Sequence, residues 1–251
     1  MNVDIVILGA GQLDKLFESD VPCKAYLPLR GRSMGSYAAE VMKSCSKNGK
    51  VIFVKEPETI LPDDIAEHAD ISCDGGKTIM ESLANGVSKS DAEYIAAVPC
   101  DIPLVTKESF LDFMEKCMEK KSDFCYSYVR RSISEKKYPE LRHTYVRLKE
   151  GTFCGGSFIL MKRSEFSKGE KLFKILSSAR KNPIQLASAF GFLNIIKLLA
   201  GRLSIAELEK KAGTLLGASV SAIESRYPEM AFNVDEPDDF ERAKNELAGV
   251  K

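Results

Sequence analysis

The stretch VILGAGQLDKLFESDVPCKAYLPLRGRSM, residues 6–34, decides what kind of α/β fold this chain can form. It continues the apolar run Val3–Leu8, which is typical of a buried strand and ends at Gly9 and Gly11. A strand that runs into a glycine turn is a common start of a nucleotide site, because glycine lets the backbone approach phosphate groups. Dinucleotide-binding proteins and proteins that bind a nucleoside triphosphate (NTP) can both begin in this way.

The residues after the turn argue against a dinucleotide. The fingerprint G-x-G-x-x-G needs a third glycine where this chain has Asp14. A crossover helix should follow at once, but Pro22 and Pro28 interrupt the next stretch and predict a long loop. The second predicted strand, residues 51–54, is followed by Lys55 rather than by an acidic residue for a ribose. The pattern therefore disfavours a dinucleotide-dependent dehydrogenase.

A triphosphate site fits the same loop better. Glycine N–H groups can approach the phosphates, while basic side chains of the loop neutralise their charge. The P-loop pattern GxxxxGK[ST] is absent, so the chain is not a P-loop NTPase. The candidate nucleotide-binding residues in this stretch are Leu8, Gly9, Ala10, Gly11, Lys15 and Lys24.

Composition limits the partners of the protein. Its 251 residues are 44% hydrophobic and 29% charged, which is ordinary for a globular protein, and 36 basic residues balance 36 acidic ones. That balance gives no global field for nucleic acid. Seven cysteines without a CxxC pair, two histidines and a start without a signal peptide indicate a reduced, cytoplasmic protein without a zinc site.

Strand and helix patterns alternate over the first two thirds of the chain, which predicts a single three-layer α/β domain over residues 1–251. Residues 164–222 have mainly helical patterns and are interpreted as a late helical insertion. Residues 184–200 are apolar but carry polar side chains and Gly191, so we expect no stable membrane insertion. Further predicted strands are residues 93–98, 123–129, 144–148 and 157–161, and predicted helices are residues 35–45, 108–118 and the end of 234–247.

These residues resemble the MobA-like nucleotidyltransferases, a family with a GT-A-type α/β fold. The resemblance begins with Gly9-Ala10-Gly11, continues with Lys24, and includes the LPLRG turn at residues 27–31. The usual Arg-Met-Gly of the family loop is missing, and Lys15 is the candidate to replace that arginine. The resemblance implies transfer of a nucleoside monophosphate from an NTP to a phosphorylated acceptor, with Mg²⁺ or Mn²⁺ as the cofactor.

Two acidic segments carry the resemblance further. The stretch YIAAVPCDIPL, residues 94–104, resembles the family strand that ends in D-x-P, whose aspartate, here Asp101, binds the metal. A carboxylate at the end of a buried parallel strand also lies where α/β sheets bind ligands, although Asp101 could instead cap a turn. The stretch AFNVDEPDDF, residues 231–240, resembles the late segment whose aspartate, here Asp235, is the second metal ligand. Asp238 and Asp239 fall at a helix start and are interpreted as structural, and Asn233 replaces a more usual aspartate.

Three further segments provide candidate binding residues. Gly75, Gly76, Lys77 and Thr78 precede a predicted helix, where they could contact the nucleotide or cap the helix. Gly155 and Gly156 resemble a family turn that borders the acceptor, but they could equally form a bulge. Within a run of basic residues, Arg142 is the first candidate to bind an acidic acceptor, whereas His143 is interpreted as a surface or turn residue.

The catalytic residues expected from these motifs are Lys24, Asp101 and Asp235, of which the two aspartates would hold the metal. The predicted partners are an NTP and a phosphorylated small-molecule acceptor, and a homodimer is left open. Two other hypotheses remain. A metal-dependent GT-A glycosyltransferase would use a sugar nucleotide but would usually carry D-x-D at the strand end. A nucleotide-binding module without catalysis would explain the altered loop.

Overall fold

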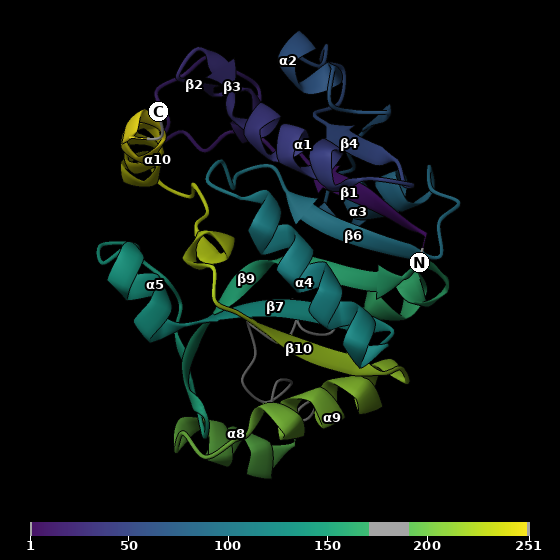
Figure 1. Ribbon diagram of the computed structural model, residues 1–251, viewed down its shortest axis with the longest axis vertical. Helices are drawn as coiled ribbons and strands as arrows, with labels where there is room; N and C mark the ends of the chain where they lie inside the picture. Colours follow the sequence, from purple (N-terminus) through teal and green to yellow (C-terminus); the bar gives the residue numbers. More distant parts are fainter. Residues whose placement is uncertain (1, 171–190, 250–251) are drawn as a thin grey trace.

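The computed structural model describes residues 2–170 and 191–249, and its centre is a mixed β-sheet (Figure 1). The strand order is β10-β7-β9-β6-β1-β4-β5, and β8 pairs with β9 as an eighth strand. The pairings β1–β4, β1–β6, β4–β5 and β7–β10 are parallel, whereas β9 runs antiparallel to β6, β7 and β8. The strands are β1 Val3–Leu8, β4 Val51–Lys55, β5 Ile71–Asp74, β6 Tyr94–Pro99, β7 Phe124–Arg130, β8 Val146–Leu148, β9 Gly151–Lys162 and β10 Val220–Ser225.

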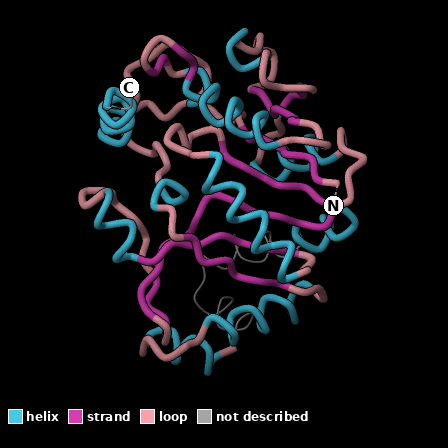
Figure 2. The backbone as a smooth tube through the Cα atoms, in the orientation of Figure 1, coloured by secondary structure: helices cyan, strands magenta, loops and turns pink. Residues whose placement is uncertain are grey.

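Helices cover both faces of the sheet and form the outer layers (Figures 1 and 2). On one face, α1 and α4 pack over a core that includes Phe53, Phe113 and Phe158. On the other face, α3 and α9 contribute Leu83 and Leu216 to a second core. The helices are α1 Met34–Cys45, α2 Asp63–Ala66, α3 Ile79–Val87, α4 Lys107–Lys120, α5 Arg131–Lys137, α8 Phe192–Leu199, α9 Ile205–Leu216 and α10 Pro237–Gly249, with 3₁₀ turns η1 Lys24–Tyr26, η2 Arg163–Glu165 and η3 Pro228–Ala231.

The first strand lies in the middle of the sheet because it is apolar on both faces. Ile5, Val6 and Ile7 are at most 2% exposed, as expected for a strand covered by helices on both sides. The parallel neighbours β4 and β6 end at the same edge as β1, so the turns that follow these three strands lie together. After the first turn the chain forms a long loop rather than a helix, as predicted, and then a short hairpin, β2 Pro28–Leu29 and β3 Arg32–Ser33.

The long strand β9 leaves an opening in the sheet along one of its edges. This edge pairs with β6 as far as Ala97 and Ile159, and with β8 from Val146 and Phe153 onward. Among the residues that the structure describes, none pairs as a strand with residues 154–158 on this edge, between the two ladders. The opening lies beyond the end of β6, next to the turn that contains Asp101.

The predicted three-layer α/β fold is confirmed, although some elements differ from the prediction. The short edge strand β5 was not predicted, and β10, Val220–Ser225, begins inside the region that the sequence indicated as helical. Helices α8 and α9 do lie within the predicted insertion, whereas residues 171–190, including the first part of the apolar stretch 184–200, lie outside the described residues. None of the helices in the described ranges has the length and apolar character needed to cross a membrane.

Candidate active site

Three charged side chains that are far apart in sequence meet at the carboxyl edge of the sheet. Lys24, in η1, places its Nζ 3.3 Å from Asp101 Oδ2 and 2.8 Å from Asp235 Oδ1. Asp101 follows β6, and Asp235 precedes α10. The Lys24 and Asp101 side chains are 23% and 17% exposed, whereas that of Asp235 is 72% exposed. The ammonium group therefore bridges one shielded and one accessible carboxylate.

Asp101 is held in position by the segment that leads to Asp235. Asn233 donates from Nδ2 to Asp101 Oδ1 at 3.2 Å, and the N–H of Val234 donates to the carbonyl oxygen of Asp101 at 2.9 Å. Ser157 of β9 in turn donates to Asn233 Oδ1 at 3.0 Å. Sequence reasoning treated Asn233 only as a weaker ligand, and the structure gives its side chain a positioning contact with Asp101.

The electrostatics of the cluster follow from its burial. Desolvation raises the pKa of Asp101, and the neighbouring Asp235 adds to the rise, while Lys24 and the Asn233 hydrogen bond oppose it. Burial lowers the pKa of Lys24, but the charges and hydrogen bonds of the two aspartates outweigh this effect and raise it. Lys24 therefore stays charged. Because this single positive charge faces two acidic groups, the cluster can attract a further cation.

The donor set fits a divalent cation that also binds phosphate. Mg²⁺ usually takes one or two carboxylates, with phosphate and water oxygens filling the remaining positions. Asp101 and Asp235 provide two converging carboxylates, since both already contact the same cationic group. Across residues 2–170 and 191–249 there is no cluster of three or more His, Cys, Asp or Glu side chains that would form an all-protein site.

The glycine turn after β1 lies tightly against the neighbouring strand. A Cβ at Gly9 would lie 2.3 Å from the Phe53 ring, so only glycine fits there without movement. Gly11 has a φ of 135°, a conformation that L side chains rarely adopt, and its N–H donates to Glu56 Oε2 at 2.8 Å. A phosphate that used this N–H would have to displace Glu56. Lys15 is exposed and is not among the groups that the structure brings to the cluster.

The turn before α3 adjoins the first glycine turn, but its polar groups are engaged locally. A Cβ at Gly75 would lie 2.3 Å from the Cβ of Ala10, which shows how closely the two turns approach. Thr78 caps α3 by accepting from the N–H of Glu81, and Glu81 accepts from the N–H of Lys77. The N–H of Gly76 donates to Ser82 Oγ at 3.0 Å. Capping thus accounts for Thr78, and nucleotide contact by this turn stays a prediction.

A cavity of about 220 Å³ opens beside Asp235 and contains the predicted acceptor side of the site. Its wall includes Arg142, which is 86% exposed and lies 3.8 Å from Glu236. Its wall also includes His143, whose Nε2 is buried without a hydrogen-bond partner and whose pKa is lowered by burial. His143 lies in a loop, in keeping with its interpretation as a turn residue, and its half-buried ring faces this cavity. Gly155 contributes to the same wall.

Two other predictions concern local structure. Gly156 packs against Ser127, where a Cβ would lie 2.3 Å from Oγ, and the β7–β9 register shifts at this point, as the bulge interpretation expected. Asp239 accepts from the N–H groups of Asp235 and Glu236 at 3.1 and 2.9 Å, which confirms its structural role at the start of α10. Asp239 thereby fixes the backbone that presents Asp235.

The fold and this edge cluster define a nucleotidyltransferase-type α/β protein, and the comparisons agree. The chain belongs to the MobA-like NTP transferase domain family, whose profile matches residues 5–161. A hypothetical transferase from Thermus thermophilus is similar at 29% identity, with a TM-score of 0.84 over 96% of this chain and 100% of that one.

Two more distant structures share the fold. One is a 2-C-methyl-D-erythritol 4-phosphate cytidylyltransferase, also from Thermus thermophilus, with 13% identity, a TM-score of 0.57, and coverage of 97% of this chain and 98% of that one. The other is a CMP:2-keto-3-deoxy-manno-octonic acid synthetase complexed with CTP, with 13% identity, a TM-score of 0.67 and 99% coverage of both chains. No protein with a curated description matches the sequence.

Proposed function

We propose that this protein transfers a nucleoside monophosphate from an NTP to a phosphorylated small molecule and releases pyrophosphate. The observation that carries the proposal is the contact of Lys24 with both Asp101 and Asp235 at the carboxyl edge of the sheet. This is the edge at which open α/β sheets bind their ligands. Membership of the NTP transferase family supports the same reaction class.

Asp101 and Asp235 are the residues that would hold Mg²⁺ or Mn²⁺. When bound, the ion supplies positive charge that offsets the negative charge of the phosphates. The two carboxylates contact one cationic group in the absence of substrate, so their geometry suits this role without a large movement.

The reaction itself needs little from the protein beyond binding and charge. An oxygen of the acceptor phosphate attacks the α-phosphorus of the NTP, and the bond between this phosphorus and the β-phosphate oxygen breaks. The electron pair of that bond leaves with pyrophosphate. Because the acceptor phosphate is already an anion at neutral pH, a general base is unnecessary, and positioning with electrostatic stabilisation provides the catalysis. Lys24 would neutralise charge on the reacting phosphates, and the Gly9–Gly11 turn would admit them.

The donor base has a clear first candidate. Both distant structural neighbours are described by their CTP or cytidylyl chemistry, so CTP is the first NTP to test in this chain. Arg142 and His143 border the cavity beside Asp235, which supports this side as the binding place of the acceptor phosphate.

The experiment uses CTP labelled separately at the α- and γ-phosphates, with Mg²⁺ and a set of phosphorylated metabolites. The proposed reaction moves the α-label into a new anion and leaves the γ-label in pyrophosphate. Release of the γ-label as inorganic phosphate would instead indicate an NTPase. If no labelled NTP of the four bases reacts while UDP- or GDP-sugars are cleaved, the glycosyltransferase hypothesis replaces the proposal. Binding of an NTP without any turnover over the whole set would leave a nucleotide-binding module.

A further inference from the structure

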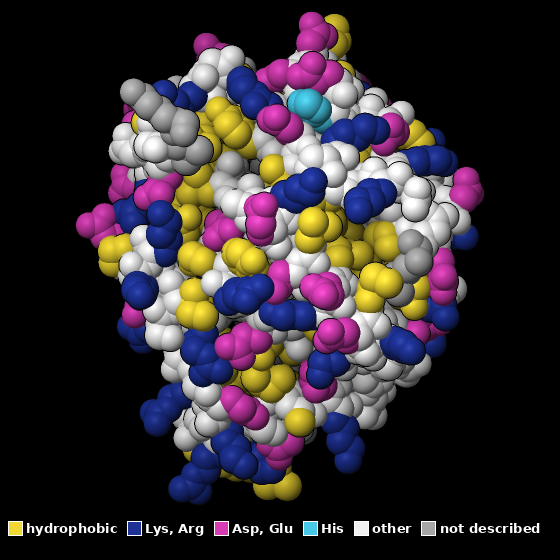
Figure 3. All heavy atoms as spheres, viewed as in Figure 1, with side chains coloured by type: hydrophobic (Ala, Val, Ile, Leu, Met, Phe, Trp, Pro, Cys, Tyr) yellow, Lys and Arg dark blue, Asp and Glu magenta, His cyan; other side chains and the backbone are white. Residues whose placement is uncertain are grey.

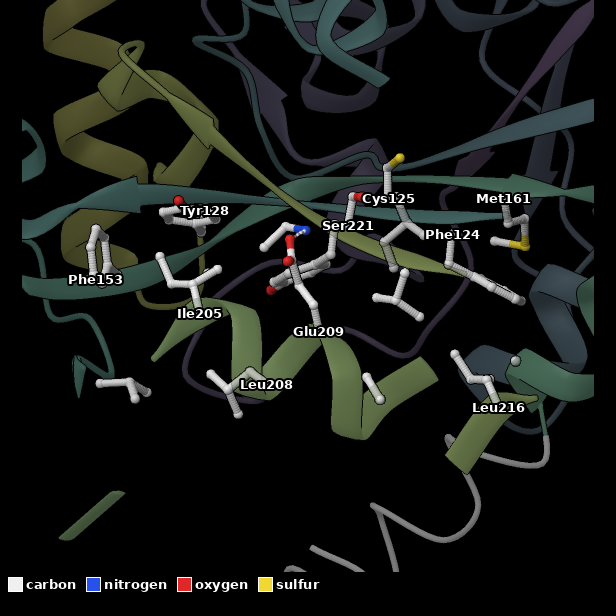
Figure 4. Close-up of a pocket in the computed structure, with 18 of the residues that line it drawn as sticks. Phe124, Cys125, Tyr128, Phe153, Met161, Ile205, Leu208, Glu209, Leu216 and Ser221 are labelled. Atoms are coloured by element: carbon white, nitrogen blue, oxygen red, sulfur yellow. Dashed lines mark hydrogen bonds between the residues drawn. The ribbon is translucent and has the colours of Figure 1, made fainter. Parts of the chain in front are cut away.

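A large apolar cavity lies between α9 and the sheet, on the face that α1 and α4 do not cover. Its volume is about 620 Å³, within the range of roughly 300–1,000 Å³ that is usual for small-molecule sites. In Figure 4, Ile205, Leu208 and Leu216 of α9 face Phe124 and Met161 of the strands across this space.

Most polar groups in the cavity wall are already bound to protein. Glu209 accepts from the N–H of Ala222 at 2.8 Å, and the Ser221 hydroxyl lies 2.7 Å from that of Ser122. The Tyr128 hydroxyl donates to Glu224 at 3.3 Å. The wall therefore offers hydrocarbon to an occupant and little that would hold a polar molecule or ordered water.

This apolar cavity adjoins the candidate active site at β9. Cys154 and Gly155 line both the apolar cavity and the cavity that contains Asp235. They lie at the sheet opening, where the edge of β9 pairs with neither β6 nor β8. A Cβ at Gly155 would lie 2.3 Å from the Tyr126 hydroxyl, so a larger residue at this shared position would have to displace the Tyr126 side chain.

We propose that the acceptor of the nucleotidyl transfer is an amphipathic phosphate, with its phosphate beside Asp235 and a hydrocarbon chain in the apolar cavity. This inference rests on the proposed function, because it assigns the substrate class of the same site. An apolar chain that enters the cavity releases water from its own surface and from the wall, and so adds affinity without any new polar contact. The same binding holds the phosphate against the reacting NTP.

The test measures the binding of butyl, hexyl and octyl phosphate to the full chain by calorimetry, without NTP. A buried methylene contributes about 0.8 kcal/mol, or about fourfold in affinity, so the four additional methylenes of octyl phosphate should make it bind roughly 200-fold more tightly than butyl phosphate. Ala212→Phe fills the cavity from α9 and should reduce the affinity difference between octyl and butyl phosphate to less than about tenfold. Ala206→Phe, on the exposed side of the same helix, is the matched control and should keep the full gain.

Thermal unfolding checks that both variants fold. If Ala212→Phe does not fold, Leu208→Gln, which puts an amide into the cavity wall, is the second variant. Equal affinity for the three phosphates would overturn the inference. So would an unchanged increase in affinity with chain length in both Ala212→Phe and Leu208→Gln.

Different results would refute the proposed nucleotidyl transfer and the proposed amphipathic acceptor. Transfer of the α-label to short polar phosphates, without chain-length dependence, would support the proposed function and overturn the amphipathic acceptor. Chain-length-dependent binding in a protein that turns over no labelled NTP would support the apolar site and refute the proposed function.

Discussion

Replacing Asp101 with asparagine should remove most of the metal-dependent nucleotide binding while changing the stability of the free protein only slightly. Burial raises the pKa of Asp101, so the fold already disfavours its ionised form. Asparagine has nearly the same shape and leaves Lys24 paired with Asp235, but its single side-chain oxygen can accept from Asn233 or from Lys24 and not from both. The relief of the buried charge and the loss of one hydrogen bond oppose each other, so we expect the melting temperature of the free variant to stay within about 4 °C of the wild-type value, the effect of about 1 kcal/mol in a chain of this size.

The substitution should have a much larger effect on the rise in melting temperature that nucleotide binding causes. A ligand at 100 times its dissociation constant stabilises the native state by about 2.7 kcal/mol. For a chain of this length that corresponds to a rise of about 5–10 °C in the melting temperature. Wild-type protein with CTP and Mg²⁺ should show such a shift, and Asp101→Asn should show less than a fifth of it, because one of the two metal carboxylates is lost.

The assay is a thermal-shift titration of CTP, GTP, ATP and UTP, each with and without Mg²⁺. Asp238→Asn is the control, since Asp238 is an exposed acid in the first turn of α10 and should keep the wild-type shift. A full Mg²⁺-dependent shift in Asp101→Asn would refute the site. A folded wild type that responds to no NTP would refute nucleotide binding by this loop altogether.

Three further predictions test other parts of the molecule. Lys24→Met should tighten Mg²⁺ binding in the absence of nucleotide, because the lysine no longer competes for the two carboxylates, and it should weaken CTP binding at least tenfold; calorimetry that shows tighter CTP binding would contradict the role of Lys24. Burial raises the pKa of the Cys23 thiol to about 11, so its neutral form stabilises the fold fully below pH 9 and this contribution is lost as the pH rises from 9 to 11. In urea titrations, Cys23→Ala should therefore flatten the loss of stability over this window by about 1.4 kcal/mol per pH unit, and an unchanged slope would show that Cys23 does not titrate there. A Cβ at Gly86 would lie 2.5 Å from Val6 and 2.9 Å from Val54, so Gly86→Ala should lower the free energy of unfolding by about 1–3 kcal/mol, and a neutral result would mean that α3 can shift away from the sheet.

The sequence predicted the central part of the fold because that part has strong local signals. The strand β1 and the parallel strands beside it are continuous apolar runs that end at glycine, proline or acidic residues. The edge strand β5, with the sequence ISCD, alternates between half-buried and exposed residues over four positions, which is too short for a periodic signal. The place of β9 between β6 and β7 depends on long-range pairing that no local pattern encodes.

The candidate site was predictable to the extent that motifs mark it. Lys24, Asp101 and Asp235 were identified from the motifs, and the structure brings their side chains into contact, while their catalytic roles stay predictions. The contact from Asn233 to Asp101 and the position of the His143 ring at the cavity could not be predicted, because each depends on how a late segment docks. The apolar cavity could not be predicted either, since it forms between α9 and strands that are distant in sequence.

The balanced charge of the sequence is visible on the surface. Figure 3 shows that charged side chains of both signs are interspersed on the outer face of the chain.

The long sequence separations within the charged cluster have a consequence for biosynthesis. Lys24 is 77 positions from Asp101 but 211 positions from Asp235. A chain emerging from the ribosome, at about 5–20 residues per second, can therefore pair the lysine with Asp101 well before the second carboxylate has been made. Asn233 and Val234, which hold Asp101, arrive equally late. Chains that stop before Asn233 would keep the glycine turn and much of the sheet yet lack the second carboxylate, so the charged cluster is complete only once Asp235 has been made.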